Sequence, residues 1–86
     1  MDNLVGELAQ KIIDVLGLFD VKLEDISAET TFFDEGLGID SVDILELVVM
    51  LERDYGVIID SRELGEKVFI DVGTLARYVG ENRSAA

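Results

Sequence analysis

The segment from residue 41 to residue 55, "SVDILELVVMLERDY", constrains the fold more than any other part of the chain. Its apolar residues recur at steps of three and four, which is the spacing of one face of an α-helix. When residues are placed 100° apart around the helix axis, one stripe consists of Ile44, Leu47, Val48, Leu51 and Tyr55. We predict that this stripe faces the core. We therefore predict a helix over 41–55, with Asp40 as its N-cap and Gly56 at its end.

The same helix carries a second apolar stripe on another side, made of Val42, Leu45 and Val49. A helix that packs on a single core does not need this stripe, so two interpretations remain. Either the neighbouring loop covers it, or it is an exposed strip on which partner proteins dock. Acidic residues surround it: Glu46 lies within the stripe, Glu52 on one margin and Asp43 just beyond the other.

The N-terminal part predicts a helix over about 3–16 and a long connection over 18–40. Asp2 or Asn3 can cap the helix, and Gly17 fits the left-handed position after its end. The connection is rich in apolar side chains, which we expect to lie against the core: Leu23, Ile26, Phe32, Phe33, Leu37 and Ile39.

The C-terminal part predicts a short helix over about 61–66, capped by Asp60 or Ser61, and a longer one from the N-cap Asp71 to Gly80. No stretch shows sustained strand alternation, although "YGVIID" has strand-like composition without an evident partner. The predicted fold is all-α: a small four-helix bundle of three main helices and one short helix, with a long loop between the first and second helices.

Length and charge limit the classes of function. A chain of 86 residues predicts one domain over 1–86, with a frayed tail over about 81–86. A net charge of −12, from 19 acids and 7 bases, argues against binding nucleic acid or anionic membranes. The acidity either serves solubility or steers the protein toward basic partners. Without a membrane-spanning run or signal-peptide features, we expect a cytoplasmic monomer with no stable membrane insertion.

Two residue types are missing, and both matter for chemistry. Without cysteine the chain has no thiol nucleophile, disulfide or sulfur ligand for zinc. Without histidine it lacks the usual general base near neutral pH, so Ser-His-Asp and Cys-His catalysis are excluded. We expect neither an enzyme nor a metal site, and a hydrolase acting through Ser41 would have no base.

Ser41 is nevertheless placed where a phosphate ester would be favoured. It would be the first residue of the helix over 41–55, where free N–H groups and the positive end of the helix dipole point outward. Asp40 and Asp43 oppose this with moderate repulsion. Taken alone, a serine in the first turn of a helix is common and indicates no function.

A resemblance gives this serine a role. The segment "DEGLGIDSVDILELVVMLERDYGVII" resembles the centre of acyl carrier proteins, which have Asp-Ser-Leu after a Leu-Gly-x step and then an acidic amphipathic helix. The N-terminal apolar helix, the approach "ETTFFDEGLG" and the final helix "DVGTLARYV" follow in the order of the family. The chain is therefore identified as a member of the phosphopantetheine-binding carrier family, in its bacterial type II stand-alone form.

The resemblance implies that 4′-phosphopantetheine is attached to Ser41 by a separate phosphopantetheinyl transferase, with coenzyme A as donor. The thiol of this arm would carry acyl groups as thioesters between enzymes of fatty acid or related lipid or polyketide biosynthesis. Asp40 would cap the helix and help the transferase to recognise the site. The positions that match the family's docking residues, which meet basic patches on acyl-handling enzymes, are Val42, Asp43, Leu45, Glu46, Val49 and Glu52.

An acyl chain could enter the bundle in a pocket lined by Leu47, Leu51, Tyr55 and Phe69. Three departures from the family pattern indicate a specialised carrier: Val42 replaces the usual leucine, Arg53 replaces a frequent acid, and the segment over 60–71 is long.

Two alternatives stay open. A peptidyl or aminoacyl carrier usually has Gly-Gly-x-Ser before the helix, whereas here Leu37 separates Gly36 from Gly38. An acidic calcium-binding interaction module would use a cluster that lacks the spacing of an EF-hand, namely Asp34, Glu35, Asp40 and Asp43.

Overall fold

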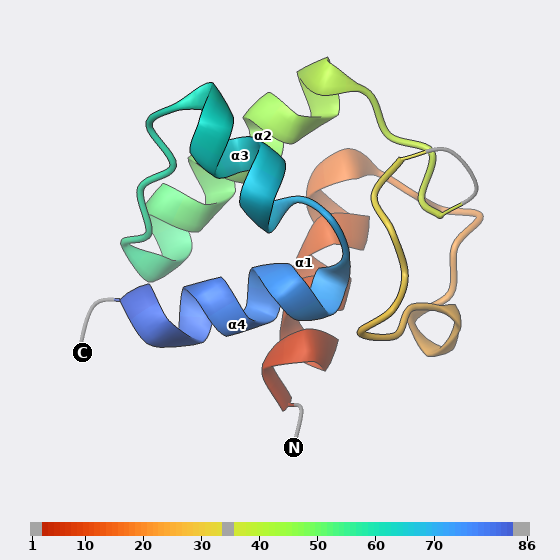
Figure 1. Cartoon of the computed structure of the whole chain (residues 1–86). Coiled ribbons are helices and arrows are strands. Elements are labelled where there is room, and N and C mark those ends of the chain that lie inside the picture. Colours follow the sequence, from red (N-terminus) through yellow and green to blue (C-terminus); the bar gives the residue numbers. More distant parts are fainter. Residues whose placement is uncertain (1–2, 34–35, 84–86) are drawn as a thin grey trace.

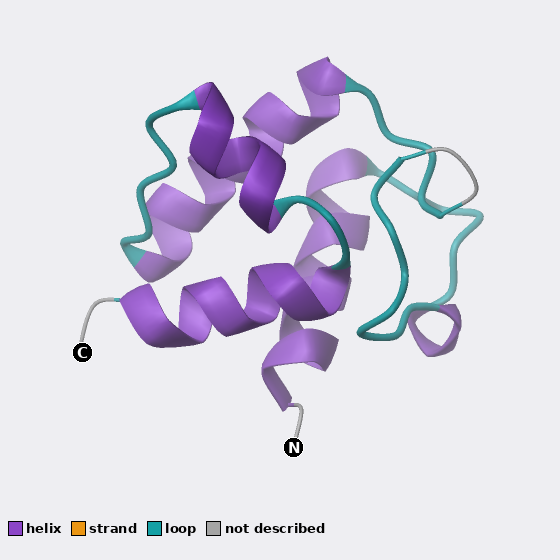
Figure 2. Cartoon of the chain, viewed as in Figure 1, coloured by secondary structure: helices purple, strands orange, loops and turns teal. Residues whose placement is uncertain are grey.

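The structure is a computed structural model that describes residues 3–33 and 36–83. Its elements, drawn in Figures 1 and 2, are α1 (Asn3–Leu16), the 3₁₀ helix η1 (Leu23–Asp25), α2 (Ser41–Tyr55), α3 (Arg62–Val68) and α4 (Val72–Asn82). Within the described ranges there is no strand, and "YGVIID" continues from α2 into irregular chain. The prediction of an all-α bundle with three main helices, one short helix and a long loop is confirmed.

The bounds of α1 and α2 agree with the predicted helices. Asn3 is already helical, and Asp2, the other predicted cap, lies outside the described residues. Gly17 and Gly56 follow the two helices with φ of 66° and 70°, the left-handed conformation that glycine adopts without steric cost.

The two C-terminal helices are longer than predicted. Ser61, and not Asp60, caps α3, because its hydroxyl accepts the N–H of Leu64 at 3.1 Å. Asp71 caps α4 as predicted, but that helix continues past Gly80 to Asn82, so the predicted end at Gly80 is wrong. The Asn82 side chain donates to the carbonyl of Tyr78 at 2.9 Å and extends the last turn. Residues 84–86 lie outside the described part.

The core lies where α1 meets α2 and α4. Figure 1 shows α1 behind, with α4 crossing in front of it and α2 running above. Each fully buried aliphatic side chain stabilises such a core by about 1.5–3 kcal/mol. The three helices contribute Leu8, Ala9, Ile12, Leu47, Met50, Leu51, Tyr55, Val72, Leu75, Ala76 and Val79.

The long loop between α1 and α2 packs on this core, but not with every apolar residue. Ile26, Phe32 and Ile39 are buried, and the Phe32 ring meets the Phe69 ring edge-to-face at 5.4 Å. Leu23 and Phe33 are instead 44% and 42% exposed, so the prediction of burial is wrong for these two. Phe33 follows the buried Phe32 at a bend of the chain, so its side chain is turned away from the core.

Hydrogen bonds hold this loop against the start of α4. Thr31 and Asp71 form an isolated bridge, and the Gly73 N–H donates to the Ala28 carbonyl at 2.8 Å. A Cβ on Gly73 would lie 2.8 Å from the Ala28 Cβ, too close for any other residue. These contacts fix the loop segment from Ala28 to Thr31 against the start of α4.

Candidate functional site

Ser41 is the first residue of α2, and its side chain is exposed. Asp40 and Asp43 form a capping box, in which the backbone N–H of each residue donates to the side chain of the other. The N–H groups of Ser41 and Val42 have no acceptor within the helix, because the first turn has no preceding carbonyls. These two amides and the positive end of the helix dipole are thus available beside the Ser41 hydroxyl.

The hydroxyl of Ser41 differs from those of two other serines. The Ser27 and Ser61 hydroxyls accept backbone N–H groups from Glu29 and Leu64, at 3.3 Å and 3.1 Å. Within residues 3–33 and 36–83, the Ser41 hydroxyl makes no hydrogen bond. It is therefore free to carry a substituent without breaking a cap or a turn.

The acids beside Ser41 are held in the capping box. The Asp43 N–H donates to Asp40 Oδ1 at 3.0 Å, and the Asp40 N–H donates to Asp43 Oδ2 at 3.3 Å. Each carboxylate is thus partly neutralised by an amide dipole. An exposed hydroxyl on a helix N-terminus with two free amides fits the phosphate ester of a phosphopantetheine arm.

The apolar strip of α2, defined by Val42, Leu45 and Val49, is uncovered. These side chains are 64%, 65% and 60% exposed, so the long loop does not cover them. Glu46 and Glu52 are exposed and Asp43 is half-buried. The strip therefore begins next to Ser41 and is surrounded by carboxylates, a combination that suits a partner with an apolar contact and a basic rim.

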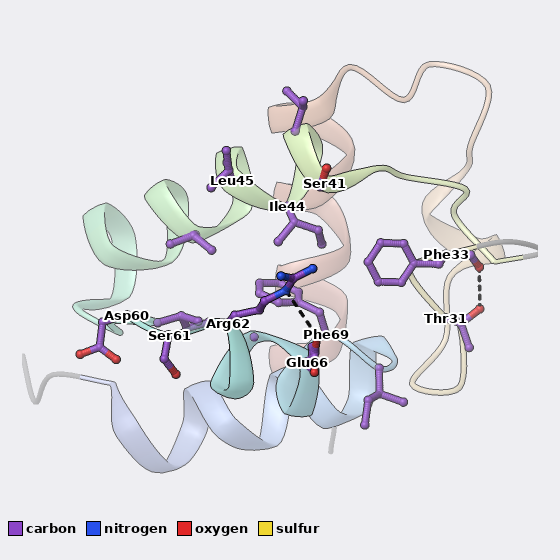
Figure 3. A pocket seen from close by; sticks show the side chains of 15 residues that line it. Thr31, Phe33, Ser41, Ile44, Leu45, Asp60, Ser61, Arg62, Glu66 and Phe69 are labelled. Atoms are coloured by element: carbon purple, nitrogen blue, oxygen red, sulfur yellow. Dashed lines mark hydrogen bonds and ion pairs between the residues drawn. The ribbon is translucent and has the colours of Figure 1, made fainter.

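An open groove of about 1310 Å³ lies between α2, α3 and the loops on either side, and Ser41 is part of its wall (Figure 3). Two residues of the apolar strip, Val42 and Leu45, also line it. The other lining residues are Thr31, Phe33, Ile44, Val48, Ile59, Asp60, Ser61, Arg62, Gly65, Glu66, Phe69 and Ile70.

The groove and the acyl pocket predicted from the sequence share only Phe69. Leu47, Leu51 and Tyr55 are buried in the core and do not line the groove. Ile44 and Val48, assigned to the core stripe, are half-buried and form the α2 wall of the groove. Spacing gives little signal for this, because Tyr55 falls between Ile44 and Val48 on the helix and is nevertheless buried.

Tyr55 instead lies at the opposite end of α2, where it contacts α1. Its hydroxyl donates a hydrogen bond to Glu7 on α1, and the Lys11 and Arg83 side chains lie over its ring at 5.7 Å and 5.2 Å from the centroid. Burial, followed by the hydrogen bond to Glu7, raises the pKa of the Tyr55 phenol well above its ordinary value. This residue joins the helices and takes no part in the groove.

Arg53, which replaces a frequent acid of the family, is paired next to this cluster. Its Nε atom donates to Asp54 Oδ1 at 3.0 Å, and Lys11 Nζ lies 3.3 Å from Asp54 Oδ2. The hydrogen bond from Arg53 is the largest of the effects that lower the pKa of Asp54. The positive charge of Arg53 is thus paired with the carboxylate of Asp54.

A family model described as the phosphopantetheine attachment site matches residues 6–79. The chain belongs to this family. The family implies a 4′-phosphopantetheine prosthetic group, which agrees with the exposed hydroxyl at the start of α2.

Curated relatives are acyl carrier proteins by name. The mitochondrial acyl carrier protein of Saccharomyces cerevisiae is 31% identical over 84 residues, which cover 92% of this chain. The acyl carrier proteins of Helicobacter pylori strains 26695 and G27 are 42% and 40% identical over 53 residues, or 62% of this chain. In each match the chain spans 65% of the relative's own length. By name, all three of these relatives are carriers.

The described residues also bear on membrane insertion and on metal binding. Among the described residues, no helix has the length and apolar character needed to cross a membrane. The same residues contain no group of three or more acids placed to hold a metal ion. Of the acids considered for calcium, Asp34 and Glu35 lie outside the described residues, and Asp40 and Asp43 cap α2.

Proposed function

We propose that Ser41 carries the 4′-phosphopantetheine arm and that the protein is an acyl carrier. The observation that supports this most directly is the free, exposed hydroxyl at the N-terminus of α2, next to an exposed apolar strip. When attached, the arm supplies a terminal thiol on which acyl groups are held as thioesters. The chain's own contribution is the attachment point and its surroundings.

The residues around Ser41 have distinct parts in this proposal. Asp40 and Asp43 fix the start of α2, so that the hydroxyl oxygen is presented at one place. The free amides of the first turn stabilise the negative phosphodiester. Deprotonation of the hydroxyl falls to the transferase, because the chain has neither histidine nor cysteine. Coenzyme A donates the arm: the bond from Ser41 oxygen to phosphorus forms as the bond to 3′,5′-ADP breaks.

Partner enzymes would dock on the apolar strip through a matching apolar patch with basic residues around it. Val42, Leu45 and Val49 supply the contact, and Asp43, Glu46 and Glu52 supply the charge. Because Val42 and Leu45 also line the groove, a docked partner would reach its mouth. The groove would hold the acyl chain between visits to the transferase and to acyl-handling enzymes.

The proposal includes a stand-alone carrier of the bacterial type II kind, acting as a cytoplasmic monomer in fatty acid or related lipid or polyketide biosynthesis. The names of the Helicobacter relatives support the bacterial assignment. The yeast relative is mitochondrial by name. The compartment of this protein is therefore tested separately, by fractionating cells that produce the full-length protein.

The decisive experiment is an intact mass after co-expression with a phosphopantetheinyl transferase. We expect one phosphopantetheine adduct, which Ser41→Ala removes. Ser61→Ala is the matched control, because Ser61 also lies at a helix N-terminus and lines the same groove, but its hydroxyl accepts the Leu64 N–H. An adduct that survives in Ser41→Ala, or no adduct on the wild type, would contradict the proposal.

A further inference from the structure

Gly65 is in the middle of α3, where a glycine is unfavourable. A glycine inside a helix is less favourable than an alanine, and α3 has only seven residues over which to offset this. Gly65 forms regular helical hydrogen bonds, from its N–H to the Ser61 carbonyl and from the Phe69 N–H to its own carbonyl. Its φ is not positive, unlike that of Gly17 or Gly56. The backbone conformation therefore does not require glycine here.

Packing does not require it either. A Cβ on Gly65 would lie 3.9 Å from Ile59 Cγ2 and 4.0 Å from Phe69 Cδ2, which is ordinary van der Waals contact. Gly73 shows the contrast, since its Cβ would lie 2.8 Å from Ala28. The missing side chain at Gly65 has one clear effect, which is to leave space between Ile59 and Phe69, and both of these residues line the groove.

Two charged residues of α3 also line the groove. Arg62 and Glu66, one turn apart, pair with each other at 3.7 Å, and their side chains are 93% and 71% exposed. Figure 3 shows this pair at the groove, with Phe69 beneath it and Ile44 on the facing wall. Because this pair is mutually compensated and largely exposed to solvent, the contacts nearest to Gly65 are the apolar side chains of Ile59 and Phe69.

We propose that Gly65 sets the depth of the groove and selects for uncharged aliphatic acyl groups long enough to reach the space between Ile59 and Phe69. This inference rests on the proposed function, because the acyl group must be delivered by an arm on Ser41, which lines the same groove. Short or charged acyl groups, including aminoacyl groups, would gain nothing from this space.

The test uses full-length protein whose arm carries an acetyl, glycyl, octanoyl or tetradecanoyl thioester, with cleavage by hydroxylamine as the readout. A buried thioester is cleaved slowly, so the wild type should show slower cleavage for the two long acyl groups. In Gly65→Leu the added side chain displaces methylenes, and each lost methylene raises the exposed fraction by up to about fourfold. Cleavage of the acetyl and glycyl thioesters should not change.

Two alanine variants separate the groove from the helix. Gly65→Ala and Gly6→Ala both place alanine inside a helix without a clash, and each should raise the melting temperature by about 4–8 °C. Only Gly65→Ala should speed the cleavage of the tetradecanoyl thioester. The comparison of Gly65→Ala with Gly6→Ala thus separates a shallower groove from a damaged fold as the cause of faster cleavage.

The failures of the two proposals are distinguishable. If no adduct forms on Ser41, the proposed function fails and the inference on Gly65 fails with it. If the adduct forms but Gly65→Ala and Gly65→Leu, both folded, cleave every thioester at the wild-type rate, only the role of Gly65 is overturned. Faster cleavage of all four thioesters alike would also overturn it, because this would indicate general loosening.

Discussion

Asp40 and Asp43 exchange hydrogen bonds across the first turn of α2, each carboxylate accepting the backbone N–H of the other residue. This reciprocal pair fixes where the helix begins and therefore where the Ser41 hydroxyl projects. The carboxylates of Asp40 and Asp43 also flank the proposed attachment point, and the hydrogen bonds of the capping box hold both of them in place.

Asp40→Ala should lower both stability and the rate of modification. Loss of an N-cap costs about 1 kcal/mol, which corresponds to a fall in melting temperature of about 4–8 °C. The transferase would also meet a frayed first turn and a missing carboxylate, so the phosphopantetheine adduct should form more slowly in a timed mass assay. Asp71→Ala is the control, because Asp71 caps α4 through the Thr74 N–H at 2.7 Å. It should lose similar stability and be modified at the normal rate; equal slowing in both variants would mean that the cap acts only through the fold.

Helix caps such as Asp40, Ser61 and Asp71 show how much of this fold the sequence could predict. Caps and helix periodicity depend on neighbours within four residues, so the bounds of α1 and α2 followed from local rules. Gly80 misled the prediction because glycine ends a helix only when it adopts the left-handed conformation, and that choice depends on the hydrogen bonds of the last turn.

The groove was harder to predict than the helices. Spacing on α2 assigned Ile44 and Val48 to the core stripe, because it could not give the distance from α2 to α3. That distance depends on tertiary contacts, such as the Phe32 ring against Phe69 and the Gly73 backbone against Ala28. The predicted acyl-lining set therefore contained core residues.

Tyr55→Phe should destabilise the protein by about 1.5–3 kcal/mol, because it removes a hydrogen bond to a charged group, the carboxylate of Glu7. It should also change the alkaline side of the stability profile. The pKa of Tyr55 is raised in the folded state above its ordinary value of 10.0. The folded protein thus holds this proton more tightly than the unfolded chain, so the stabilisation is complete below pH 10 and is lost as the pH rises through the raised pKa.

Urea unfolding from pH 8 upward measures this effect. The wild type should lose stability above about pH 10, and Tyr55→Phe should lose less over the same interval. The groups that face the phenol and its ring are Glu7, Lys11, Asp54 and Arg83. Tyr78→Phe, which removes a phenol outside this cluster, should keep the wild-type slope; identical slopes for wild type and Tyr55→Phe would argue against the coupling.

Glu46→Lys should weaken transfer to partner enzymes by reversing a charge within the apolar strip. We expect kcat/KM to fall at low salt through a slower association, with helicity unchanged by circular dichroism. Glu24→Lys on η1 is the matched control, since it makes the same change in net charge at an exposed position on a different element. The two variants should converge at 1 M salt, where charges are screened beyond about 3 Å. Equal kinetic defects would mean that only net charge matters and that α2 is not the docking face.

Divalent cations should stabilise this protein by screening and not by occupying one site. A net charge of −12 on a small domain makes the folded state repel itself, so both sodium and calcium should raise the melting temperature, calcium at lower concentration. Asp40 and Asp43 already use carboxylate oxygens in the capping box, which leaves them poorly arranged for a shared cation. Calorimetric titration with calcium should therefore show weak heats without a stoichiometric end point, and Asp43→Asn should change them little. A single tight site abolished by Asp43→Asn would favour the calcium-binding alternative, and its persistence in Ser41→Ala would show that it is independent of the carrier function.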